Sequence, residues 1–159
     1  MKHAKSSNSA FDSAVRSLTR RNHSRWELKT KLIQKGFSSE EIKTALNRLT
    51  ELGYLNDQNY AYDYCRHRLK QSPRGQKLLS SELMKRGLPR VLIEQVLEDI
   101  YQEFPEDGLV AGLVEKWRRS KYNELTESEV MKFAQSLARK GFNWDCIRIH
   151  LPPYVSKGE

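Results

Sequence analysis

The chain has 159 residues and a formal net charge of +8 at pH 7, with 38% hydrophobic and 30% charged residues. Its two cysteines, Cys65 and Cys146, are too few for a disulfide framework and indicate reduced thiols. Because no signal-peptide core or apolar run of membrane length occurs, we expect a cytoplasmic protein that makes no membrane contact. The excess of basic over acidic residues favours a polyanion or an acidic protein as partner.

Three helices are predicted in the first third of the chain. The first covers residues 11–21. Ser24 with Glu27 has the pattern of a capping box that begins a second helix, and Ser38 with Glu41 has the pattern of another that begins a third.

The same succession recurs twice further along the chain. Residues 57–70 and 106–121 are predicted helices equivalent to the first one. Pro89 suits the first position of a later helix in the middle of the chain, and Thr126 with Glu129 forms a further capping box. Since no sustained period-two alternation of apolar residues occurs, we expect nine helices and no sheet.

One pattern is repeated three times around a glycine. A leucine lies four residues before it, a base immediately before it, a large apolar residue immediately after it, an isoleucine six residues on and a leucine ten residues on. The three sets are Leu32, Lys35, Gly36, Phe37, Ile42 and Leu46; Leu83, Arg86, Gly87, Leu88, Ile93 and Leu97; and Leu137, Lys140, Gly141, Phe142, Ile147 and Leu151. Each glycine is expected in the left-handed conformation just past a helix, where the next residue packs back on the leucine.

These patterns predict an all-α fold of three tandem three-helix repeats that form an elongated, curved and fairly stiff array. A repeat of about fifty residues has only a marginal core by itself, so neighbouring repeats should pack against one another. The expected divisions are a disordered tail at residues 1–9, repeats at 10–54, 55–103 and 104–152, and a C-terminal tail at 153–159. Such an array offers a long binding surface rather than one catalytic pocket.

Three blocks resemble motifs of a known family. Residues 24–32, Ser-Arg-Trp-Glu-Leu-Lys-Thr-Lys-Leu, resemble its Ser-x-x-Glu-Leu-x-x-Lys-Leu motif. Residues 53–61, Gly-Tyr-Leu-Asn-Asp-Gln-Asn-Tyr-Ala, are similar to its Gly-Tyr-Leu-Asp-Asp-x-x-Phe-Ala block. Residues 75–88 carry Gly, Glu-Leu and Lys-Arg-Gly-Leu at the spacing of its second-unit signature. Over residues 11–148 the chain is identified as a member of the RecX family, the bacterial regulators of the RecA recombinase.

The resemblance implies a protein that binds the RecA filament on single-stranded DNA and lowers its ATP hydrolysis, strand exchange and coprotease activity. Its expected context is homologous recombination, DNA repair and the SOS response. The alternative is a stand-alone DNA-binding protein of helix-turn-helix-like units, and binding of double-stranded DNA stays open. We expect a monomer that binds no cofactor. Because the chain has no phosphate-binding loop or catalytic motif, we also expect that the protein is not an enzyme.

Charge is segregated along the chain. Basic stretches of the first two units are candidate contacts for DNA or the filament, and a merely solvated charged face is the alternative. These bases are Arg20, Arg21, Arg25, Lys29, Arg66, Arg68, Lys70, Arg74, Lys77, Lys85, Arg86 and Arg90. An acidic stretch follows, in which Glu94, Glu98 and Asp99 are candidate contacts for a basic protein surface.

Tryptophans form a second group of candidates. Trp26 lies about 160° around its helix from Leu28, so it faces away from the core stripe. It is a candidate protein contact, although packing against a neighbouring unit is favoured because exposing a tryptophan side chain to water is unfavourable in free energy. Trp117 and Trp144 are predicted to lie in the core.

No metal site is expected from the sequence. Cys146 and His150 share a helix face, but two ligands do not close a zinc site. Cys65 and His67 are two residues apart and therefore point in different directions on a helix.

Overall fold

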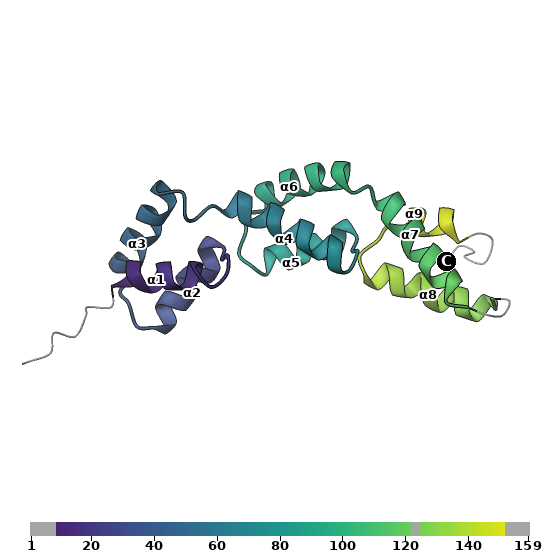
Figure 1. Ribbon diagram of the computed structural model, residues 1–159, viewed down its shortest axis with the longest axis horizontal. Coiled ribbons are helices and arrows are strands. Elements are labelled where there is room, and N and C mark those ends of the chain that lie inside the picture. The colour runs from purple at the N-terminus through teal and green to yellow at the C-terminus, as the bar shows by residue number, and fades with distance from the viewer. Residues whose placement is uncertain (1–8, 122–124, 152–159) are drawn as a thin grey trace, which may run out of the picture.

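The computed structural model describes residues 9–121 and 125–151, and over these ranges the chain forms nine α-helices and no strand. The helices form successive groups along one long axis (Figure 1). The groups are α1 (Ala10–Leu18), α2 (Arg25–Gln34) and α3 (Ser39–Glu51); α4 (Asp57–Gln71), α5 (Gln76–Met84) and α6 (Arg90–Glu103); and α7 (Glu106–Arg119), α8 (Glu127–Arg139) and α9 (Trp144–His150). The predicted all-α array of three-helix repeats is thereby confirmed.

Each group has a core of its own, built from the repeated leucines and isoleucines. In every group, three residues of the pattern are buried, with at most 3% of their surface exposed. They are the leucine four residues before the glycine, the isoleucine six residues after it and the leucine ten residues after it. Burying one such side chain stabilises the fold by about 1.5–3 kcal/mol. The divisions after residues 54 and 103 stay predictions. Leu55 packs in the first core and Phe104 against the second, so both connectors contribute to the unit that they follow.

Helix starts follow the predicted chemistry, with one correction. Reciprocal capping-box hydrogen bonds are present at Ser24 and Glu27, Ser38 and Glu41, and Thr126 and Glu129. Pro89, predicted as the first helical residue, is instead the N-cap of α6: its ψ of 142° is extended, and its carbonyl accepts the first helical bond from the Ile93 N–H. The first helices of the three units also end elsewhere than predicted, at Leu18, Gln71 and Arg119.

Helix ends are set by the repeated glycines, as predicted. Gly36, Gly87 and Gly141 have φ values of 84°, 73° and 87°, in the left-handed region that other residues rarely adopt. The residue after each glycine donates its N–H to the carbonyl of the repeated leucine. The N···O distances are 3.3 Å for Phe37 and Leu32, 3.4 Å for Leu88 and Leu83, and 3.3 Å for Phe142 and Leu137.

Two joints link the units, and both use the same parts of the repeat. At the first joint the Ser24 hydroxyl donates to the Arg86 carbonyl at 2.6 Å. At the second joint the Gly75 N–H donates to the Lys140 carbonyl at 2.9 Å. Ser24 and Gly75 are the N-caps of α2 and α5, and Arg86 and Lys140 are the bases before the repeated glycines. A helix start of one unit therefore meets the helix stop of the next.

The glycine that follows each of these bases lies against the preceding unit. A Cβ on Gly87 would overlap the side chain of Trp26, and a Cβ on Gly141 would lie 2.5 Å from the Leu78 nitrogen. At Gly36, by contrast, a Cβ would meet no atom within 4 Å. The repeated glycine thus ends a helix in all three units and also permits close packing between units in two of them.

His23, in the connection between α1 and α2, makes stability depend on pH. The residue is 5% exposed, and burial, followed by the nearby Arg21 cation, lowers its pKa below the usual 6.5 despite the Glu27 carboxylate. The folded state therefore keeps this imidazole neutral while the unfolded chain takes up a proton as pH falls through about 6.5, so its contribution is complete above that pH and is lost below it.

We expect the free energy of unfolding to fall more steeply between pH 7 and pH 5.5 in the wild-type protein than in a His23→Gln variant. Urea unfolding at both pH values measures the difference. Equal pH slopes in the two proteins would contradict the assignment.

Candidate nucleic-acid interface

Several arginines of the predicted basic cluster are engaged within their own unit. Arg66 lies 3.0 Å from Glu103, and Arg90 lies 2.8 Å from Glu94. Both pairs are exposed, so each contributes little to stability. Each pair nevertheless places a carboxylate beside an arginine that was predicted from the sequence to contact DNA.

A tighter group surrounds Glu82 of α5. Its carboxylate forms ion pairs with Arg74 and, at 3.6 Å, with Arg68, and it accepts a hydrogen bond from the Tyr64 hydroxyl at 2.7 Å. The Arg68 Nε donates to the Tyr64 oxygen at 2.9 Å, and the Arg86 guanidinium lies 4.3 Å from the Tyr64 ring centre. Burial, followed by the bond to Glu82, raises the pKa of Tyr64. These three arginines hold α4 and α5 together.

Arg25 and Arg21 are engaged in the first unit. The Arg25 guanidinium donates to Asn47 at 2.7 Å and to Thr50 at 3.0 Å, which ties α2 to α3. Its backbone N–H donates to Asp57 of α4 at 2.7 Å. Arg21 lies 3.4 Å from Glu27. Both arginines therefore have structural partners.

The remaining predicted bases are exposed and form no ion pair within residues 9–121 and 125–151. They are Arg20, Lys29, Lys70, Lys77 and Lys85. Lys132 and Arg139 of α8 are exposed in the same way and were missed in the sequence, because six uncharged residues separate them. The second helix of each unit thus carries exposed bases, or is followed directly by one.

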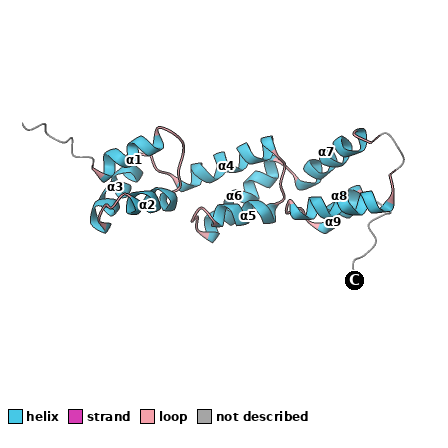
Figure 2. Cartoon of the chain, turned by 90° about the horizontal axis from the view of Figure 1, so that it is seen from below, coloured by secondary structure: helices cyan, strands magenta, loops and turns pink. Residues whose placement is uncertain are grey.

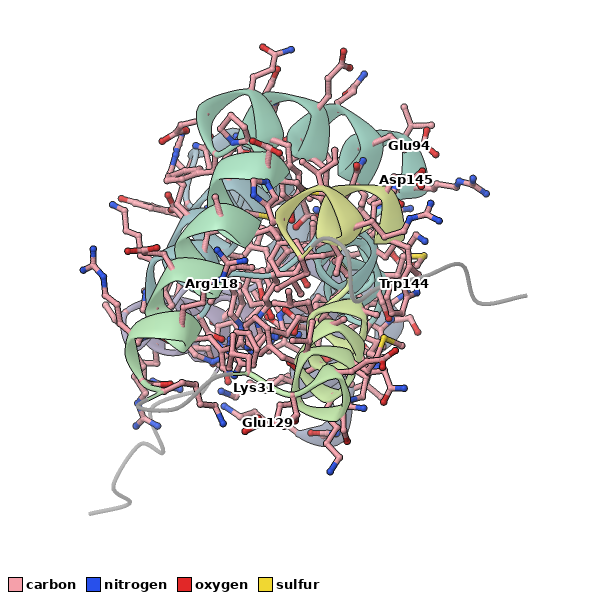
Figure 3. The ribbon with its side chains drawn as sticks, turned by 90° about the vertical axis from the view of Figure 1, so that its right-hand side faces the viewer. Lys31, Glu94, Arg118, Glu129, Trp144 and Asp145 are labelled. Atoms are coloured by element: carbon pink, nitrogen blue, oxygen red, sulfur yellow. The ribbon has the colours of Figure 1, made fainter. Side chains whose placement is uncertain are left out.

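Acidic residues lie on the third helices. Glu94, Glu98 and Asp99 of α6 are exposed, and Asp99 accepts a hydrogen bond from the Tyr62 hydroxyl. Figure 2 shows α2, α5 and α8 in one row, with α6 and α9 behind α5 and α8 in this view. Along the array axis, Figure 3 shows Lys31 of α2 near the lower edge and Glu94 of α6 at the upper right. Second and third helices therefore present different sides of the array.

The tryptophans differ from one another in their surroundings. Trp26 contacts Gly87 across the first joint and remains 49% exposed, so it packs against the neighbouring unit, as favoured from the sequence, and also keeps a free face. Trp117 stacks on Phe133 in the third unit with ring centres 4.3 Å apart. Trp144 is 38% exposed, so the prediction of a core position was wrong. It is the first residue of a short helix, one position after the cap and off the buried face.

Comparison with known proteins matches the first two units separately. A family model described as "RecX, first three-helix domain" matches residues 10–49, and one described as "RecX, second three-helix domain" matches residues 56–97. The chain belongs to the RecX family. The family resemblance identified from the sequence is thereby confirmed, and RecX proteins are regulators rather than enzymes.

Relatives of known name cover nearly the whole chain. The regulatory protein RecX of Legionella pneumophila (strain Corby) is 36% identical over 140 residues, which are 87% of this chain and 89% of that protein. The regulatory protein RecX of Pelodictyon phaeoclathratiforme is 30% identical over 150 residues, which are 94% and 91% of the two chains. The crystal structure of RecX from Lactobacillus salivarius matches with a TM-score of 0.78 and 27% identity, over 89% of this chain and 91% of that one.

Within the described part of the chain, no helix has the length and apolar character needed to cross a membrane.

Proposed function

We propose that this protein binds the RecA filament on single-stranded DNA and lowers its ATP hydrolysis, strand exchange and coprotease activity. Membership of the RecX family supports a regulatory role toward RecA. The observation that carries the finer proposal is the recurrence of exposed bases on the second helices. Within the described residues, bases that are exposed and form no ion pair occur on or directly after α2, α5 and α8, although others lie elsewhere, and three exposed acids lie on α6. The array then contacts phosphates with one side and a basic protein surface with another.

The proposal narrows the candidate DNA contacts to those free bases that lie on, or directly after, the second helices. Lys29, Lys77 and Lys85 belong to or directly follow second helices and are exposed. Arg68, Arg74 and Arg86, by contrast, surround Glu82 or Tyr64. A lysine ammonium without a partner gives up only water when it meets a phosphate, whereas an arginine in an ion pair must first break that pair.

Charge reversal tests this assignment. Changing Lys29, Lys77 and Lys85 together to glutamate should weaken binding to single-stranded DNA within the RecA filament and abolish inhibition of RecA ATP hydrolysis. Three lost phosphate contacts on a single strand should reduce the slope of log affinity against log salt by about 2. Fluorescence anisotropy with a labelled oligonucleotide at several salt concentrations measures the slope, and steady-state hydrolysis measures the inhibition.

A matched control reverses three bases on third helices, Lys43, Arg90 and Arg148, with the same change in net charge. This variant should keep wild-type inhibition and salt slope. Equal losses in both triple variants would show that net charge rather than position matters. A wild-type protein that leaves RecA hydrolysis unchanged but prefers one duplex sequence would favour the stand-alone DNA-binding alternative instead.

A further inference from the structure

The third unit brings three side chains of metal-binding type together where α7 begins beside α9. Cys146 and His150 are four residues apart on α9 and share a face, and Asp107 lies in the first turn of α7. The Asp107 carboxylate is 2.7 Å from the His150 Nε2. One ligand atom from each of the three residues lies within 4.8 Å of the other two. Asp107 is remote in sequence, so its addition to the Cys146–His150 pair emerges only from the fold.

We propose that Asp107, Cys146 and His150 form a binding site for one divalent transition-metal ion, with Zn²⁺ as the best fit. A thiolate, an imidazole and a carboxylate are the donors that tetrahedral Zn²⁺ takes, at about 2.3, 2.0 and 2.1 Å respectively. Ligand atoms around such an ion lie roughly 3.4–3.7 Å apart. The observed group therefore needs changes of about 1 Å, which side-chain rotation supplies without backbone movement.

The surroundings of these three side chains favour the binding of a cation. Cys146 and His150 are half-buried, and Asp107 opens the group to solvent, which leaves room for water as a fourth ligand. One carboxylate oxygen of Asp107 lies within 4.8 Å of both the Cys146 sulfur and a ring nitrogen of His150, and its negative charge attracts a divalent ion. On binding, the thiol releases its proton to solvent and its thiolate becomes the ligand.

The site has a structural consequence because it lies beside the second joint. Glu106, adjacent to Asp107, accepts the Gln76 N–H at the start of α5 at 2.7 Å. An ion held between α7 and α9 fixes the start of α7, and with it the acceptor that this joint uses. Metal binding should therefore raise the melting temperature of the folded chain.

Cobalt and zinc titrations of the untagged full-length protein test the site. Co²⁺ should produce a thiolate-to-cobalt absorption band that saturates at one ion per chain and disappears when Zn²⁺ is added. Cys146→Ser should remove the band. His150→Ala and Asp107→Asn should each weaken Zn²⁺ binding by more than the roughly 10- to 100-fold that loss of an outer-shell partner costs.

The chain offers a matched control in Cys65 and His67 of α4, the same residue types at a spacing of two, with Cys65 buried. His67→Ala should bind both metals like the wild-type protein. Far-ultraviolet circular dichroism checks that every variant stays helical, and His150→Gln replaces His150→Ala if the latter does not. Absence of the band in the wild-type protein overturns the proposal, and so does wild-type affinity for Zn²⁺ in any one of the three ligand variants.

Discussion

Gly75→Ala is expected to open the joint between the second and third units, although Gly75 has a φ of −80° that any residue can adopt. An alanine Cβ would overlap the Gly141 carbonyl and the Phe142 nitrogen, which are backbone atoms and cannot rotate away. Separating the two backbone segments to make room also breaks the hydrogen bond from the Gly75 N–H to the Lys140 carbonyl. Overpacking of this kind costs about 1–3 kcal/mol, and the lost hydrogen bond adds to it.

The measurable result is a loss of cooperativity. A three-helix unit has only a marginal core by itself, so a third unit without its joint should unfold at a lower temperature than the rest. Thermal unfolding followed by circular dichroism should change from one transition to two. Amide hydrogen exchange in α8 and α9 should become faster in the variant.

Two glycines elsewhere supply controls. Gly36 shares the left-handed conformation of Gly141, but a Cβ there meets no atom within 4 Å. Gly36→Ala should therefore cost about 1–2 kcal/mol of local strain and leave the joints intact. Gly112 lies in α7 with the same open space, so Gly112→Ala should stabilise that helix by about 1 kcal/mol. A Gly75→Ala protein that melts like Gly112→Ala would contradict the tight joint.

These glycines show how far the sequence could predict the fold. A leucine, a base and an apolar residue around Gly36 and Gly141 follow one local rule, and local hydrogen bonding obeys it in both places. The packing of Gly141 against Leu78 depends on how two units are oriented, which no local pattern encodes. The helix ends at the repeated glycines were therefore predictable, while the second role of the same glycine was not.

The candidate site, too, could be predicted from the sequence only in part. The sequence shows the number and order of the bases, but not which of them have an acid beside them. Glu82 is the one acid between Arg66 and Arg90, so the count of charges gave it no importance. In the fold it lies at the centre of this basic cluster and forms ion pairs with Arg68 and Arg74. Asp107 joined Cys146 and His150 only through the packing of α7 on α9.

The other large effect is expected at Glu82. Its side chain is 15% exposed, and that of Arg74, its ion-pair partner, is 19% exposed. The Arg74 Nε already has no hydrogen-bond partner within the described residues. Glu82→Ala would leave a half-buried guanidinium without a counter-charge, so the free energy of unfolding should fall by about 3–5 kcal/mol. Urea unfolding at constant pH and salt measures it.

Glu98 provides the control, because it is exposed on α6 and forms no ion pair in the described ranges. Glu98→Ala should change the free energy of unfolding by less than about 0.5 kcal/mol. In a double-mutant cycle, Arg74→Met should cost less in the Glu82→Ala background than in the wild-type protein, because the unpaired charge is then removed. Additive effects of the two substitutions would show that the ion pair contributes little.

The Glu82 substitution also separates stability from binding. Reversing Arg68 or Arg74 breaks the group around Glu82, so loss of filament binding in such a variant would not identify a contact. Glu82→Gln keeps every arginine and changes only the acid that engages them. If the arginines have a purely structural role, this variant should be less stable than the wild-type protein and yet inhibit RecA hydrolysis equally at a temperature where both are folded. Stronger inhibition by Glu82→Gln would instead mean that release from Glu82 frees these arginines to bind phosphate, and the contact surface would then extend from the second helices onto α4.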